Sequence, residues 1–225
     1  MKLFDLFPNE FFDGSSQMKK DFSKELCSSL NPDQLLISAR AEINSLINNA
    51  NISDFSKEFC LRCFDKAPDE FFILPSSTTG KYHGGRTSLE NCIGGNIIHT
   101  KNVLAMSDRV LHRYKGLIID DRLGELLKVS CLLHDICKVP SGEVYTKDTH
   151  GEDGADLIKY VFDTFDPDVV PSEDYIGIIT HAVANHMYLW KFQNVWSQVA
   201  NTDLNSNLSY LLVGLMLSEC DYYAI

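Results

Sequence analysis

Basic residues are scarce in this chain compared with acidic ones. Its 225 residues include 20 Lys and Arg against 31 Asp and Glu, which gives a formal net charge of −11 at pH 7. An acidic surface repels a polyphosphate unless a local basic patch overrides the repulsion. This balance argues against a protein that coats DNA or RNA, and it makes nucleic acid a disfavoured partner.

Long apolar runs are also lacking. No run approaches the roughly 18 residues that a membrane span needs, and the acidic N-terminal segment 1–10 is too short for a signal peptide. The seven cysteines are odd in number and irregularly spaced, which is typical of reduced core residues. Cys60 and Cys63 have zinc-knuckle spacing, but no second CxxC or HxxxH motif accompanies them, so we expect both to pack inside a helix. We therefore expect a cytoplasmic protein that does not contact a membrane.

The pattern that is present is helical almost throughout, and strand-like alternation is scarce. Capping residues and apolar periodicity predict an all-α fold with helices at about 31–48, 53–64, 96–114, 122–138, 151–165, 172–190 and 206–223. We expect residues 1–75 to form an N-terminal helical extension and residues 76–225 to form the main domain. Five glycines between Ser76 and Gly95 are too many for a regular element and predict an ordered loop beside the functional site.

The pair His134-Asp135 stands out because it interrupts an apolar run, residues 129–138, where a buried helix should carry Leu or Ala. An ionisable pair in such a place is costly without a partner, and a bound metal is the obvious one. Other candidate ligands follow in an orderly series along the chain. In chain order, the predicted metal ligands are His99, His134, Asp135, His150, His181, His186 and Asp221. Imidazole and carboxylate donors together suit Mn, Fe, Co, Ni or Zn, and Mg is a further candidate.

This series resembles the H…HD…D signature of the HD-domain metal-dependent phosphohydrolase superfamily. Residues 131–138 resemble the family's LLHDIGK element, with Cys137 where Gly is usual, and the segments around His150 and Asp221 resemble the helices that follow. Residues 76–100 are similar to the GKYH…GGL..HT segment of many HD proteins, including phage-encoded ones. The resemblance covers about residues 76–225 and implies an HD-domain helical bundle that binds one or two divalent ions.

The two oxygens of Asp135 allow it to bridge two ions. In that arrangement, which the resemblance to binuclear HD proteins implies, His99, His134 and Asp221 complete one site, and His150, His181 and His186 supply the second. His181 and His186 are five residues apart on one predicted helix, about 140° around its axis. Both therefore reach one site only if the helix ends or bends there, and otherwise one of them supports the ligands from outside.

Metal chemistry of this kind activates a water molecule for attack at phosphorus. We predict catalytic roles for Asp135 and for Lys138, which would neutralise charge on the scissile phosphate. The alternative for Lys138 is a solvated helix-end lysine that interacts with the helix dipole. Lys81, His83 and Arg86 lie among glycines and are the predicted substrate-binding residues.

The predicted function is hydrolysis of a phosphoester or phosphoanhydride bond in a small phosphorylated nucleotide. Two alternatives stay open: an HD-type 3′→5′ exonuclease, which the spacing of His181 and His186 also resembles, and a non-catalytic nucleotide-binding HD module that acts as a sensor or blocks a host factor. Because the chain stops four residues after Asp221, the last helix has little support. A homo-oligomer partner or a further segment is therefore expected to cover it.

Overall fold

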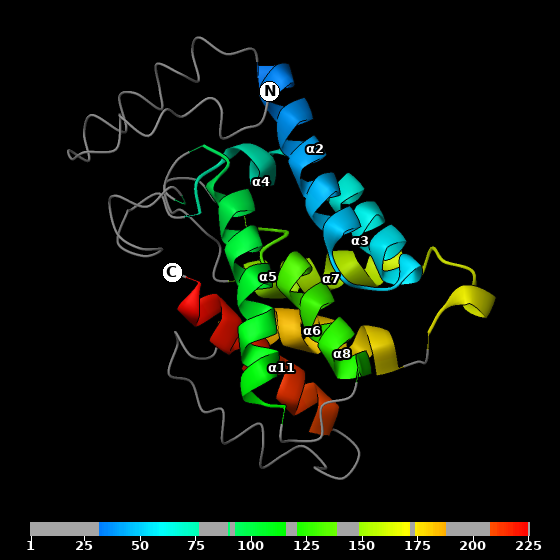
Figure 1. The fold of residues 1–225 in the computed structure, drawn as a ribbon. Coiled ribbons are helices and arrows are strands. Elements are labelled where there is room, and N and C mark those ends of the chain that lie inside the picture. Colours follow the sequence, from blue (N-terminus) through cyan, green and yellow to red (C-terminus); the bar gives the residue numbers. More distant parts are fainter. Residues whose placement is uncertain are drawn as a thin grey trace.

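The computed structural model describes residues 32–76, 90, 93–115, 121–138, 149–171, 174–187 and 208–224. Within these residues the chain forms α-helices and one short 3-10 helix, Pro167–Val169, and no strand (Figure 1). The α-helices are α2 (Pro32–Asn49), α3 (Asp54–Lys66), α4 (Asp69–Ile73), α5 (Gly95–Arg113), α6 (Asp121–Leu133), α7 (His150–Phe162), α8 (Asp174–Asn185) and α11 (Leu208–Tyr223). The predicted all-α fold is confirmed.

Helices α2 and α3 begin within one residue, and end within two residues, of the positions that the sequence predicts. Pro32 occupies the first position of α2, where its missing N–H costs nothing. Ser53 caps α3, with its Oγ accepting a hydrogen bond from the backbone N of Ser56 at 3.2 Å. The helix ends at Lys66, since Ala67 precedes Pro68 and adopts an extended conformation.

Two helices end about five residues earlier than predicted, each directly before a candidate ligand. α6 ends at Leu133 rather than near residue 138, and α8 ends at Asn185 rather than near residue 190. In each case the next residue is a histidine whose Nδ1 contacts a carbonyl of the last helical turn: His134 contacts Cys131 O at 2.9 Å, and His186 contacts Val183 O at 2.7 Å. These side chains satisfy carbonyl groups that the helix end leaves without an intrahelical partner. The chain then continues as turns in both places.

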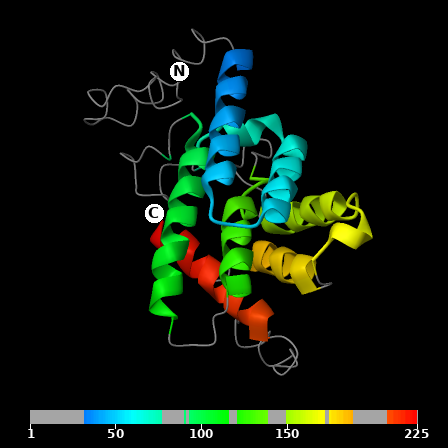
Figure 2. The ribbon, with the colours of Figure 1, turned by 45° about the vertical axis from the view of Figure 1, so that its right-hand side comes forward.

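Helix α6 forms the centre of the core. Its second half is buried on every side, with Leu126, Leu127, Val129, Leu132 and Leu133 no more than 1% exposed. It contacts α3, α5, α8 and α11, so that helices from distant parts of the chain surround it (Figure 2). Burial of each such side chain stabilises the fold by roughly 1.5–3 kcal/mol, and this packing fixes where α6 ends relative to its neighbours.

Helices α2 to α4 pack against the same hydrophobic core as the later helices. On α3, the ring of Phe59 lies 5.9 Å from that of Phe162 and 6.0 Å from that of Tyr175, measured between centroids. Cys60 and Cys63 are buried on the same helix, as expected for packing residues. The division into an extension at 1–75 and a domain at 76–225 stays a prediction. Within the described part of the chain, no helix has the length and apolar character needed to cross a membrane.

Candidate metal centre

Histidine and aspartate side chains from five helices meet in the interior of the bundle. His99 lies on α5, His134 and Asp135 directly follow α6, His150 begins α7, His186 directly follows α8, and Asp221 lies on α11. Each of these residues is no more than 4% exposed. Ligands from separate helices converging inside a bundle are the usual way in which helical folds build a metal site.

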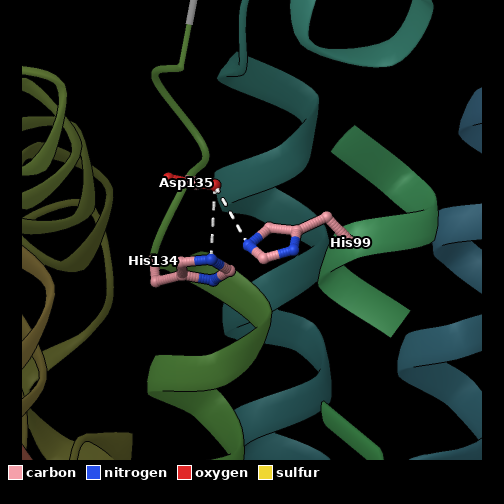
Figure 3. A group of neighbouring side chains, drawn as sticks. All are labelled: His99, His134 and Asp135. Carbon is pink, nitrogen blue, oxygen red and sulfur yellow. Dashed lines mark ion pairs between the residues drawn. The ribbon is translucent and has the colours of Figure 1, made fainter. Parts of the chain in front are cut away.

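Asp135 lies at the centre of this group and presents its two oxygens to different histidines. Its Oδ2 is 3.6 Å from His99 Nε2 and 3.3 Å from His134 Nε2 (Figure 3). Its Oδ1 is 3.2 Å from His150 Nε2 and 3.4 Å from His186 Nε2. One carboxylate therefore connects two clusters of imidazole nitrogens.

Asp221 adds a second carboxylate to the cluster of His99 and His134. Its Oδ1 lies 2.9 Å from His99 Nε2 and 3.9 Å from His134 Nε2. We call His99, His134, Asp135 and Asp221 the first half-site. Asp135, His150 and His186 form the second half-site, in which the two histidine Nε2 atoms are 3.2 Å apart. The ligand atoms of His99, His134 and Asp135, and likewise those of the second half-site, lie within 4.8 Å of one another.

The histidine rings are held so that Nε2 points inward. The Nδ1 atoms of His134 and His186 donate to backbone carbonyls, as described above, and His99 Nδ1 donates to Glu90 Oε2 at 3.2 Å. A hydrogen bond that occupies Nδ1 leaves the lone pair of Nε2 available as a ligand, which is how metal-binding histidines are generally oriented.

Two buried atoms at the centre show that the residues fit a metal ion. His134 Nε2 and Asp135 Oδ1 are buried, yet neither makes a hydrogen bond. A buried polar atom without a hydrogen bond costs about 1–3 kcal/mol, and both atoms face the interior of a half-site. A divalent ion in the first half-site would satisfy His134 Nε2, and one in the second would satisfy Asp135 Oδ1. The mixed nitrogen and oxygen donors suit a transition metal.

The protonation states of the group also suit metal binding. Burial raises the pKa of Asp135, but the ammonium of Lys138 and the neighbouring His134 outweigh this effect and hold the pKa well below its usual value. Asp221 is likewise held below its usual pKa against the effect of burial, mainly by its hydrogen bond with His99. Burial lowers the pKa of His186. Both carboxylates are therefore ionised and His186 is neutral at pH 7, the forms that ligate metals.

His99 differs from His186 in its protonation. Burial lowers its pKa, but hydrogen bonds to Asp221 and Glu90 outweigh burial and raise the pKa to about 9. Without a metal, the ring is therefore protonated at neutral pH. An ion that binds at the first half-site has to displace this proton.

The structure does not bring His181 to either half-site, although the sequence predicts it as a metal ligand. His181 lies on α8 one turn before the helix ends, and its ring packs 5.6 Å from that of Tyr210, between centroids. The side chain of Asn185 contacts both its Nδ1, at 3.4 Å, and its backbone carbonyl, at 2.8 Å. The early end of α8 turns His186 inward and leaves His181 facing α11.

Lys138 lies beside the bridging carboxylate, with its Nζ 2.7 Å from Asp135 Oδ2. The prediction that it continues the helix of His134 is wrong, because α6 ends at Leu133 and the backbone N of Lys138 closes a tight turn onto Asp135 O at 2.8 Å. The predicted substrate-binding residues Lys81, His83 and Arg86 lie outside the described residues.

Sequence reasoning missed one residue of this centre, Glu90. It is 2% exposed, and its carboxylate contacts His99 Nδ1 and Asn102 Nδ2 at 3.2 and 2.6 Å. Its place in the glycine-rich segment gives no periodic signal, so only the contact with His99 reveals it.

Comparison with known protein families agrees with this geometry. The HD-domain family model matches residues 96–223, more than half of the chain, and this range contains every residue of the two half-sites. No curated protein and no solved structure gives a significant match. The chain belongs to the HD-domain superfamily of metal-dependent phosphohydrolases.

Proposed function

We propose that this protein hydrolyses a phosphoester or phosphoanhydride bond of a small nucleotide, using divalent ions held by the two half-sites. The observation that carries the proposal is the geometry of Asp135, whose Oδ2 faces His99 and His134 while its Oδ1 faces His150 and His186. A carboxylate shared in this way can bridge a pair of ions. We propose Mn, Fe, Co, Ni or Zn as the metal, with Mg as a further candidate.

Two ions bound here would supply a water molecule with a lowered pKa and would neutralise charge on the phosphate oxygens. The chain's own residues supply the positioning. The first half-site offers four protein ligands and the second offers three, so more coordination positions are left for water and substrate at the second. Burial of all the ligands excludes bulk water, which strengthens every electrostatic interaction in the centre.

Lys138 is the proposed stabiliser of charge on the phosphate. Its Nζ already contacts Asp135, and its side chain is only 11% exposed, so a phosphate that reaches the half-sites meets a poorly solvated positive charge. Removal of one such group from an active site typically lowers kcat by about 10²–10³. Lys81, His83 and Arg86 are proposed to bind other phosphates of the substrate, on the basis of their sequence motif.

The substrate class follows from the charge of the molecule. A net charge of −11 repels long polyanions, whereas a small nucleotide needs only local positive charge. The exonuclease alternative rests on the spacing of His181 and His186. The ring of His181 packs against Tyr210, whereas His186 Nε2 lies 3.2 Å from His150 Nε2, and this difference favours the small-nucleotide proposal. We retain exonuclease activity and non-catalytic nucleotide binding as outcomes of the tests below.

The first test is Asp135→Asn, which keeps the size of the side chain. Whichever way the amide turns, only one half-site keeps an oxygen, so metal content should fall from two ions per chain to one or none. Turnover should fall with it. Asp156→Asn is the matched control, because Asp156 is an exposed aspartate of α7 that belongs to neither half-site. Elemental analysis that finds unchanged stoichiometric metal in Asp135→Asn would contradict the proposed centre.

The second test is phosphate release from a panel of mono-, tri-, cyclic and dinucleotides with each candidate metal. Turnover of at least one member, absent after chelation, is the expected result. Processive degradation of single-stranded RNA or DNA without turnover of the panel would support the exonuclease instead. Tight nucleotide binding without any turnover would support the non-catalytic module.

A further inference from the structure

We propose that Glu90 is a positioning residue for the first half-site: its carboxylate orients His99 and strengthens that imidazole as a metal ligand. This inference rests on the proposed function, because it assumes that the half-sites bind metal. It concerns a residue outside the ligand set, and it assigns a role to the glycine-rich segment before α5.

The contacts of Glu90 define one direction for the His99 ring. Glu90 Oε2 lies 3.2 Å from His99 Nδ1, and on the opposite side of the ring Nε2 faces Asp221 Oδ1 at 2.9 Å. A proton on Nδ1 that is donated to Glu90 leaves the lone pair of Nε2 directed into the half-site. The Glu90 carboxylate therefore lies on one side of the His99 ring, and the position for a metal lies on the other.

His99 differs in this respect from two other histidines of the centre. The Nδ1 atoms of His134 and His186 donate to backbone carbonyls, which carry no net charge. His99 donates to a carboxylate. A charged acceptor makes the imidazole a stronger electron donor than a neutral one does, so the first half-site gains affinity that a backbone carbonyl would not provide.

The fold holds the Glu90 carboxylate at this position from both ends. Its second oxygen, Oε1, accepts a hydrogen bond from Asn102 Nδ2 at 2.6 Å, and Asn102 lies on α5 one turn after His99. A buried carboxylate is costly unless its oxygens have partners. Both oxygens of Glu90 have them, although the residue is only 2% exposed.

Backbone contacts also hold Glu90 in place. Its carbonyl oxygen accepts a hydrogen bond from the backbone N of Ser76 at 2.8 Å. A Cβ atom at Gly95 would lie 1.9 Å from that oxygen, so only glycine permits this approach. The first residue of α5 thus leaves room for the residue that supports His99 four positions later.

The experiment measures metal affinity directly, by two-site calorimetric titration of the full chain with Mn²⁺ and with Zn²⁺. Glu90→Ala should weaken binding at one site by about 10–100-fold and leave the other site within twofold, because the ligand that Glu90 contacts, His99, belongs to the first half-site. Glu90→Gln keeps a hydrogen-bond acceptor without the charge, and Asn102 can turn its amide to match. It should therefore fall between the wild-type protein and Glu90→Ala.

Glu70→Ala, on the exposed surface of α4, is the control and should bind both ions like the wild type. Turnover provides a second readout, in which kcat should fall while KM changes less, since Glu90 supports the metal rather than the substrate. Circular dichroism establishes that each variant is folded. If Glu90→Ala does not fold, Glu90→Gln decides.

Metal affinities within twofold of wild type in folded Glu90 variants would overturn the inference. The proposed function would survive that result if Asp135→Asn still lost metal. If the wild-type protein binds no ion, the proposed function fails, and this inference fails with it.

Discussion

Asp135 is only one side chain, yet its two oxygens face different sets of imidazoles. This division depends on the end of α6: the turn after Leu133 places His134 and Asp135 side by side with both side chains directed inward. In a continued helix, two consecutive side chains would point about 100° apart around the axis. The helix end is therefore what allows two adjacent residues to serve one centre.

His181 and His186 provide a matched pair for testing this geometry. His186→Ala should remove a ligand of the second half-site and lower metal content by about one ion per chain. His181→Ala should leave metal content unchanged, because its ring packs on Tyr210 rather than on the centre. Elemental analysis of both purified variants measures the difference. Equal loss in the two variants would show that His181 also reaches the metal.

Among the helices, α7 and α8 have to approach each other closely for His150 and His186 to meet. Gly151, the second residue of α7, makes this approach feasible. A Cβ atom there would lie 2.9 Å from Val183 O and 3.0 Å from Ala184 O, in the last turn of α8. Backbone atoms cannot swing aside as a flexible side chain can, so the two helices would have to separate.

We therefore expect Gly151→Ala to weaken metal binding at the second half-site by at least about tenfold, the lower range for disturbed ligand support. Gly124→Ala on α6 is the control, since its Cβ would meet only Leu111 side-chain carbons, at 3.6 Å or more. That substitution should keep full metal affinity and stabilise the fold by about 0.4–1 kcal/mol. Titration calorimetry and chemical denaturation measure the two effects. Normal binding in Gly151→Ala would mean that the helices tolerate the separation.

Glu125 joins α6 to the start of α3. It accepts hydrogen bonds from the backbone N of Ser53, at 3.1 Å, and from the hydroxyl groups of Ser53 and Ser56. Burial raises the pKa of Glu125, but these hydrogen bonds outweigh it and lower the pKa below its ordinary value. The resulting stabilisation is present above the pKa of the unfolded chain, about 4.3, and is lost as the pH falls through the lower pKa of the folded protein.

Glu125→Gln should accordingly reduce the free energy of unfolding by about 1 kcal/mol at pH 7, a value discounted for the solvent exposure of the group. The difference from wild type should shrink toward zero at low pH, where the Glu125 carboxyl group is protonated and is uncharged like the amide of Gln. Urea denaturation across a pH series measures it, with Glu70→Gln, at an exposed position of α4, as control. A difference that does not depend on pH would show that the ionised carboxylate is not the source of the stability.

At the scale of the whole molecule, the two half-sites connect α5, α6, α7, α8 and α11 through one buried group of polar residues. His99 and Asp221 are 122 positions apart and still in contact. An ion that binds this group in the folded state alone therefore stabilises the entire arrangement, because unfolding separates all of its ligands.

Metal-loaded protein should consequently melt at a higher temperature than protein treated with a chelator. Free metal at 100 times the Kd adds about 2.7 kcal/mol per site, which corresponds to a rise of roughly 5–10 °C for a chain of this size. Calorimetry of the two forms measures the shift, and Asp135→Asn should show a smaller one. Identical melting temperatures would indicate that the metal does not join these helices.

The sequence alone determined the fold class and most of the candidate ligands. Helical periodicity is local, so the all-α fold could be predicted from apolar spacing and capping residues such as Ser53. The ligands were visible because histidine and aspartate in apolar helical runs are costly unless something binds them. His134-Asp135 could be selected on that ground before any contact was known, and His99 and Asp221 by the resemblance of the series to the H…HD…D signature.

Tertiary structure decided which of these residues meet and what supports them. The end of α8 at Asn185 turns His186 inward and leaves His181 on Tyr210, and no local pattern marks that end. Glu90 becomes part of the centre only through its contact with His99, which the approach of Gly95 permits. Hydrogen bonds and steric limits of this kind involve residues that are distant in sequence or lie in irregular segments. Sequence periodicity therefore cannot predict them.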